Sequence, residues 1–400
     1  MAKDKSDIVL DTDKPSKAWV ILLTLGIIGM VGGVACTVGS FLIPAPEVAT
    51  DEYPTLPSSS NSEKIYSDLT GLEISSKSEN SLPTFCIQTP NGTDGARPQA
   101  GLDKAGVIFE AIAEAGITRL AAIYQGPKTS VIGPIRSLRL YYLQWDTPFD
   151  CTIVHAGGAD DALAAVKNGG YKDLTESVTY MYRGSSSTRR WNNLFTTGIM
   201  LNQFATDYGY TTSKVNGFTR MTPDESDKAR VDETVAEKLN IIKPAVSNTS
   251  EIKPKAANIT IRFGALPTYN VTYTYDAKTN KYNRAYENNN INEILSCPDG
   301  DNGKVDPEKV CQKVSYLTPS VIVAMVVQER KASDNYHEDI TAIGSGEAYI
   351  FQNGTVIHGG WSKQTDKDQI KFNDSTGREV KLAPGQTIIE AVPTYGAIEY

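Results

Sequence analysis

An uncharged apolar run near the N-terminus constrains the architecture of this chain more than any other feature. It extends from Ala18 to Ile43 and contains no Asp, Glu, Lys or Arg. A helix needs about 20 apolar residues to cross the hydrocarbon core of a membrane. The run is long enough, so the sequence predicts one transmembrane helix over residues 18–43 and a folded part confined to one side of the membrane.

A cleaved signal peptide, with a lipid attached at Cys36, is the alternative interpretation of the same run. The apolar residues continue to Ile43 beyond Cys36, whereas the apolar region of a signal peptide spans about 7–15 residues and stops at the cleavage site. Gly33 also stands where lipoprotein signals usually carry Leu. Both features favour an uncleaved anchor.

The residues that flank the run predict its orientation. Lys14 and Lys17 precede it, and the next basic residue is Lys64. Because positive charge near a membrane helix tends to stay in the cytoplasm, residues 1–17 are expected there and the rest of the chain outside. The predicted location is therefore the cell membrane, with a single pass and extracytoplasmic domains.

The length and the composition of the chain predict two exterior domains and argue against a nucleic-acid partner. The net charge of −8 argues against nucleic-acid binding, which normally needs a basic face. The chain is long enough for two domains beyond the anchor. A stretch rich in Pro, Ser, Thr and acidic residues at 44–63 and a polar stretch at 243–255 are typical of linkers, so we expect domains at 64–245 and 256–400.

The first domain is predicted to mix strands and helices, as an α+β or α/β fold. Apolar runs bounded by turn residues predict strands, and longer periodic segments predict helices, one of which starts at Pro134. The expected strands are 84–89, 117–125 and 151–156, and the expected helices are 135–145, 159–170 and 197–209.

The second domain is predicted to be mainly antiparallel β. Asn353-Gly354 lies between two apolar runs, which is typical of a hairpin turn. Helical patterns are scarce after residue 255. The expected strands are 258–263, 269–276, 320–328, the two arms of 347–361, and 386–393.

The cysteines fit an oxidising compartment. Cys297 and Cys311 bracket a polar loop, and a disulfide there would contribute roughly 3 kcal/mol. Cys86 and Cys151 stand in apolar stretches, where a second bridge and simple buried thiols are both consistent with the sequence.

Signatures of dedicated catalysis are absent from the sequence. It contains no GxSxG, Walker, HExxH or CxxC motif. His155, His337 and His358 lack the spacing of metal ligands, so neither a metal nor a cofactor is predicted.

Two carboxylates lie in an apolar stretch that precedes Arg119. Glu110 and Glu114 are four residues apart, a spacing that places both on one face of a helix or a strand. They are candidates for paired acid/base work, as in glycosidases. The alternative is that they form structural salt bridges with Arg119 and other arginines.

Two basic residues and a histidine suggest an anion site. Arg136 and Arg139 fall in the first turns of the helix expected to open at Pro134, where a carboxylate or phosphate group is favoured. Pairing with nearby Glu or Asp is the alternative. His155 precedes Gly157-Gly158 at a strand-to-helix corner, so a general base, a ligand contact and a hydrogen-bonded structural histidine are all consistent with it.

Several stretches together resemble the YerB-like lipoproteins of bacterial envelopes. They are YSDLTGLEI, ARPQAGLDKAGVIFEAIAEAGITRLAAIYQ, IGPIRSLR, VHAGG, RWNNLFTT, GSGEAYIFQNGTVIHGGW and LAPGQTIIEAVP. The resemblance implies an envelope location and two domains, but no reaction, because both family domains are of unknown function. It gives weight to a shared pocket of residues in these stretches: Arg97, Glu110, Glu114, Arg119, Arg136, Arg139, His155 and Asn193. Family members are typically anchored by a lipidated cysteine, and this chain departs from that pattern.

Three functions follow from these observations. The first is a tethered binding or regulatory module with an arginine-rich pocket for an anionic ligand such as a cell-wall fragment. The second is an envelope hydrolase or transferase that acts on peptidoglycan or glycans through Glu110 or Glu114 with His155. The third is a scaffold for other envelope proteins. The missing catalytic signatures favour the first and third, and hence a protein that is not an enzyme.

Overall fold

The computed structural model describes residues 64–186, 189, 191–230, 256–264, 266–288 and 291–400. The predicted cytoplasmic segment, the apolar run and the linkers at 44–63 and 243–255 lie outside these residues. Among the residues that are described, no helix is long and apolar enough to cross a membrane.

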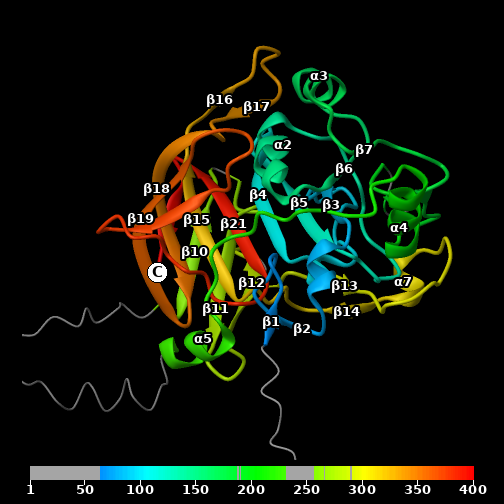
Figure 1. Cartoon of the computed structure of the whole chain (residues 1–400). Coiled ribbons are helices and arrows are strands. Elements are labelled where there is room, and N and C mark those ends of the chain that lie inside the picture. The colour runs from blue at the N-terminus through cyan, green and yellow to red at the C-terminus, as the bar shows by residue number, and fades with distance from the viewer. Residues whose placement is uncertain (1–63, 187–188, 190, 231–255, 265, 289–290) are drawn as a thin grey trace, which may run out of the picture. The chain divides into compact units, whose positions relative to one another are not determined.

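A ten-stranded mixed sheet forms the centre of the fold (Figure 1). Its strand order is β20-β19-β18-β15-β21-β4-β5-β3-β6-β7. The strands are β3 (Thr84–Pro90), β4 (Val107–Glu114), β5 (Ile117–Gln125), β6 (Thr152–Val154), β7 (Asp173–Leu174), β15 (Val321–Val327), β18 (Gly344–Gln352), β19 (Thr355–Lys363), β20 (Lys371–Asp374) and β21 (Thr387–Pro393).

Strands from both predicted domains meet in this sheet. Near the C-terminus, β21 lies between β15 and β4 and pairs in parallel with each of them. Figure 1 shows this as red β21 beside cyan β4. The described residues between 64 and 400 consequently form one compact unit.

Both faces of the central strands are covered, which explains their continuous apolar sequences. On β15, Val321, Val323 and Met325 pack into one core with Trp145. Ile322 on the same strand points to the opposite face, into a core shared with the four-stranded sheet described next. These two packed layers position the ends of β3, β4 and β5, where the candidate site lies.

A second, antiparallel sheet covers part of the central one. Its order is β12-β11-β10-β22. Four further pairs of short strands complete the β structure of the described residues: β1-β2, β8-β9, β13-β14 and β16-β17. The remaining strands are β1 (Ile65–Tyr66), β2 (Glu73–Ile74), β8 (Tyr182–Arg183), β9 (Leu194–Phe195), β10 (Asn258–Arg262), β11 (Val271–Asp276), β12 (Lys281–Tyr286), β13 (Ile294–Ser296), β14 (Gln312–Val314), β16 (Glu329–Lys331), β17 (Glu338–Ile340) and β22 (Ala397–Glu399).

The helices of the described residues are few and short, so the fold is mostly β. The α-helices are α2 (Leu140–Asp146), α3 (Asp160–Gly169), α4 (Gly198–Asp207), α5 (Pro223–Ala229) and α7 (Pro307–Val310). The 3-10 helices are η1 (Lys77–Ser81), η2 (Leu102–Lys104) and η3 (Thr147–Phe149).

The prediction of a helix from Pro134 was wrong, because α2 begins only at Leu140 with Arg139 as its N-cap. The preceding backbone donates its hydrogen bonds to other segments instead of to its own turn. Ile135 N–H donates to Leu194, Arg136 N–H to Gln88 and Leu138 N–H to Gly157. These tertiary bonds hold the segment extended despite its helical pattern.

Most other local predictions were confirmed. Helices form at the expected places as α3 and α4, although α3 is capped by Gly170, one residue later than Gly169. Asn353 and Gly354 adopt positive φ values of 55° and 74°, as a tight hairpin turn requires. Cys297 and Cys311 form the predicted disulfide, and Cys86 and Cys151 form a second one.

Candidate functional site

A cavity of about 490 Å³ opens where β3 and β4 end and β5 begins. We call it the arginine pocket. The segment before α2 and the turns that precede β11 and β17 complete its wall. The lining side chains with charge or large polar surface are Asp94, Glu114, Arg119, Arg136, Asn192, Tyr269 and Tyr336.

Glu114 is the electrostatic centre of one wall. Its two carboxylate oxygens lie 2.5 Å from Arg119 Nη2 and 2.5 Å from Arg139 Nη2. Burial opposes its ionisation, but the two guanidinium groups outweigh that effect and hold the pKa of Glu114 below its usual value. Glu114 is therefore ionised and paired with two cations. This is the structural salt bridge that was predicted from the sequence as the alternative to an acid/base role.

Arg136 differs from these arginines because it forms no ion pair with any described residue. Asn192, itself buried, accepts a 2.9 Å hydrogen bond from Arg136 Nε. Both terminal nitrogens of Arg136 remain without a described partner. Burial and the nearby charge of Arg119 lower the pKa of Arg136, although Asp94 opposes that shift.

Arg97 stands behind the pocket wall. Its guanidinium carbon lies 3.5 Å from the ring centre of Tyr286 and 5.3 Å from that of Tyr269. Arg97 Nε also donates to Asn91 Oδ1 at 3.0 Å. These contacts support Tyr269 and Asn91, so Arg97 shapes the wall without lining it.

Glu110 belongs to a separate buried network. It accepts hydrogen bonds from Asn91 Nδ2 at 3.0 Å and Thr118 Oγ1 at 2.6 Å. Arg284 of β12 forms an ion pair with it. Glu110 is fully buried and does not line the arginine pocket.

The prediction that Glu110 and Glu114 share one face and one site was wrong, because their partners do not overlap. The pairing of β4 with β5 shifts register between Ile112 and Glu114. Such a bulge breaks the two-residue alternation of side chains. Glu114 thus meets Arg139 at the start of α2, while Glu110 faces Arg284.

His155 and Asn193 lie outside the pocket. The ring nitrogens of His155 contact the carbonyl oxygen of Gly157 at 2.7 Å and the Asp173 carboxylate at 2.9 Å. Both nitrogens are thus committed within the fold, which matches the hydrogen-bonded alternative. Asn193 accepts from Arg183 at 2.9 Å, and its neighbour Asn192 is the residue that lines the pocket.

Several residues that complete the site carry no signal in the sequence. Asn192 adjoins a predicted candidate and is distinguished only by its burial. Tyr269 and Tyr336 come from the distant β-rich part of the chain. Among the described residues, no group of three or more His, Cys, Asp or Glu side chains is arranged to hold a metal ion.

Comparison with known proteins identifies relatives of this chain. Residues 69–211 match the domain described as "Protein of unknown function (DUF3048) N-terminal domain", and residues 259–389 match its C-terminal counterpart. "Putative lipoprotein YerB" of Bacillus subtilis is 25% identical over 339 residues, which cover 84% of this chain and 88% of that protein.

A solved structure shares the fold. The crystal structure of YerB from Bacillus subtilis matches with a TM-score of 0.64 and 23% identity, over 84% of this chain and 100% of that chain. At that identity the likeness establishes the fold alone.

Proposed function

This chain belongs to the DUF3048 family of proteins of unknown function, and we propose from its own geometry that it is a binding module whose arginine pocket takes a small anionic ligand. The observation that carries the proposal is Arg136, a half-buried guanidinium that forms no ion pair with any described residue and faces a cavity.

The charge balance supports an anion. Arg119 and Arg136 line the pocket, and buried Arg139 pairs with Glu114 from outside the lining, so three guanidinium groups stand against the carboxylates of Glu114 and Asp94. Glu114 is already shared by two of the cations. A carboxylate or phosphate that enters beside Arg136 would restore neutrality and accept two parallel hydrogen bonds from its terminal nitrogens.

The rest of the wall suits a ligand with a ring. Tyr336 is 59% exposed at the tip of the β16–β17 hairpin, and Tyr269, which is buried, also lines the pocket. Tyrosine rings offer flat apolar surface together with a polar hydroxyl. An acidic sugar, such as a carboxylated fragment of the cell wall, combines both requirements.

The proposed location is the cell envelope. The similar Bacillus subtilis protein is named as a lipoprotein, which supports association with a membrane. For this chain we propose anchoring through the apolar run at 18–43, with the folded part outside the cytoplasm. A scaffold role for other envelope proteins stays a prediction. Among the described residues, no contact brings Glu110, Glu114 and His155 together as the predicted hydrolase or transferase site would require.

Calorimetric titration of the full chain in a non-sugar detergent tests the proposal. The probes are inorganic phosphate and N-acetylmuramic acid, with neutral N-acetylglucosamine as the uncharged comparison. We expect an acidic probe to bind the parent and to lose at least about tenfold in affinity with Arg136→Gln, because a charge-assisted contact disappears.

Arg378→Gln is the matched control, since Arg378 is exposed and pairs with Asp374 away from the pocket. It should bind as the parent does. If neither acidic probe binds the folded parent, or if both variants bind equally well, the arginine pocket is not an anion site.

A further inference from the structure

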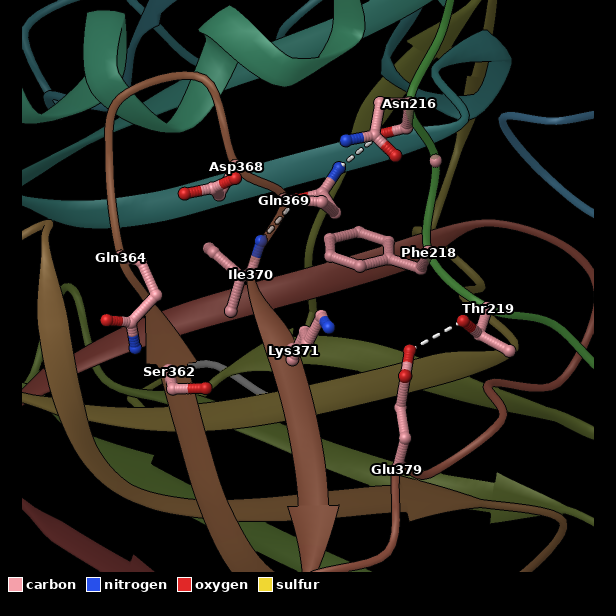
Figure 2. Close-up of a pocket in the computed structure, with 11 residues that line it drawn as sticks. Asn216, Phe218, Thr219, Ser362, Gln364, Asp368, Gln369, Ile370, Lys371 and Glu379 are labelled. Atoms are coloured by element: carbon pink, nitrogen blue, oxygen red, sulfur yellow. Dashed lines mark hydrogen bonds between the residues drawn. The ribbon is translucent and has the colours of Figure 1, made fainter.

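A second cavity, of about 620 Å³, lies on another part of the molecule (Figure 2). We call it the polar groove. Residues 216–219 form one side, and the end of β19, the following loop and the start of β20 form the other. Phe218 and Ile370, both buried, supply its apolar floor.

Internal bonds hold the groove in shape. Buried Lys363 donates from Nζ to the backbone carbonyls of Asp366, at 3.1 Å, and Asp368, which ties the loop into a tight turn. Gln369 joins the two sides, because its Nε2 donates to Asn216 O at 2.7 Å. Thr219 donates to Glu379 at 2.6 Å across the same gap (Figure 2).

The groove also presents polar groups that the fold leaves unused. Four lining side chains form no hydrogen bond or ion pair with any described residue: Asn216, Ser362, Gln364 and Lys371. Amides and hydroxyls both donate and accept hydrogen bonds. This set therefore complements a ligand that does the same, which is the character of sugar hydroxyl and acetamido groups.

The charges of the groove exclude the ligand proposed for the arginine pocket. Lys371 stands among the carboxylates of Asp368 and Glu379, and the lining contains no arginine. The excess is negative, so an anion would be repelled. A neutral polar ligand meets no such penalty.

An extended peptide is disfavoured because the nearby sheet edge is already occupied. Peptides that add a strand need free main-chain groups along the edge. At β20, Phe372 O accepts from Val380 N at 2.7 Å, and Asp374 N donates to Arg378 O at 2.8 Å. The groove offers side-chain amides and hydroxyls instead of an open ladder.

A second cavity next to the polar groove favours a chain of sugars over a single one. A smaller cavity of about 270 Å³ shares Asn216, Gly217 and Phe218 with the polar groove, so the two adjoin along this segment. Gly217 allows its segment to pack closely against the backbone at Asp68, because a Cβ at residue 217 would lie 1.8 Å from the backbone oxygen of Asp68.

We propose that the polar groove binds a neutral oligosaccharide, at a site independent of the arginine pocket. Saturation-transfer NMR and calorimetry on the full chain in a non-sugar detergent test this. The probes are chitotetraose, which carries acetamido groups, and cellotetraose, which has the same linkage without them. Binding of either supports the proposal, and a preference for chitotetraose assigns the acetamido contact.

The double variant Asn216→Ala/Gln364→Ala should weaken binding by about tenfold without a change in melting temperature, since two neutral hydrogen bonds are lost. Arg136→Gln should bind the sugars as the parent does, which separates this site from the arginine pocket. Absence of saturation transfer from both tetrasaccharides at about 10 mM overturns the proposal, as does a folded double variant that binds like the parent.

Discussion

Glu110 and Glu390 occupy directly paired positions on the parallel strands β4 and β21, and both side chains are fully buried. One cation serves both, because Arg284 contacts Glu110 through Nη2 and lies 3.6 Å from Glu390 through Nε. Two buried carboxylates beside one guanidinium favour a single shared proton. Burial and the neighbouring Glu110 accordingly raise the pKa of Glu390.

This pair predicts a change of stability with pH. A carboxyl whose pKa is higher in the folded state stabilises fully below its unfolded value, near 4.5 for Glu390. That contribution is lost as pH rises through the folded pKa. Glu390→Gln should therefore gain stability relative to the parent between about pH 5 and pH 8, by at most about 1.4 kcal/mol per pH unit.

Chemical denaturation across that pH range measures the difference. Glu347→Gln is the control, because Glu347 is exposed on β18, and it should leave the slope of stability against pH as in the parent. Parallel curves for Glu390→Gln and the parent would mean that the pKa of Glu390 is not raised in the folded protein.

The two arginines proposed together from the sequence should behave differently when removed. Arg139 is buried and paired with Glu114, so Arg139→Ala should lower the free energy of unfolding by about 3 kcal/mol. Arg136 is without an ion pair, and Arg136→Ala should change it by less than about 1 kcal/mol. Urea denaturation of both variants checks this.

Equal destabilisation by the two substitutions would contradict this interpretation. It would show that Arg136 also supports the fold, and the free terminal nitrogens would then lose their significance for ligand binding.

The two disulfides should differ in their effect on stability. The Cys86–Cys151 bridge spans 65 residues and the Cys297–Cys311 bridge spans 14. In the chain-entropy description, the longer loop is worth about 4 kcal/mol and the shorter one about 3 kcal/mol. Replacing the first pair by Ser should therefore lower the melting temperature more than replacing the second. The reverse order would indicate that packing around Cys86 and Cys151 compensates for the lost bridge.

Local sequence patterns predicted strands and turns well, because those depend on alternation and on turn residues. The strand at 117–125 and the hairpin at Asn353-Gly354 form as expected. The failures share a cause, which is tertiary hydrogen bonding. Ile135 and Arg136 have a helical pattern, yet their N–H groups bond to Leu194 and Gln88.

Part of the candidate site was predictable because some of its residues are neighbours along the chain. Glu114, Arg119 and Arg136 lie close along the chain and do line one pocket. The partner of Glu110, however, is Arg284, which lies 174 residues away. A register shift such as the one after Ile112 also leaves no mark in a single sequence, so the faces of Glu110 and Glu114 could not be told apart.

The disulfides bear on the membrane topology that the N-terminal run predicts. All four cysteines of the described residues are bridged. Disulfides persist in oxidising compartments and are rare in the cytoplasm. This agrees with the exterior location that we propose for the folded part, with the run at 18–43 as the proposed anchor and Lys14 and Lys17 on its cytoplasmic side.

A reporter that is active only in the cytoplasm, fused after Tyr400, should therefore give no signal, whereas one active only outside should give a strong signal. Replacing Lys14 and Lys17 by Glu, with two lysines added after Ile43, reverses the charge bias and should shift signal toward the cytoplasmic reporter.

The intact mass of the protein distinguishes the type of anchor. An uncleaved helix leaves residues 1–35 in place, whereas maturation at Cys36 removes them and adds a lipid. A cytoplasmic signal from the parent fusion would overturn the topology, because bridged cysteines and an exterior ligand both require export.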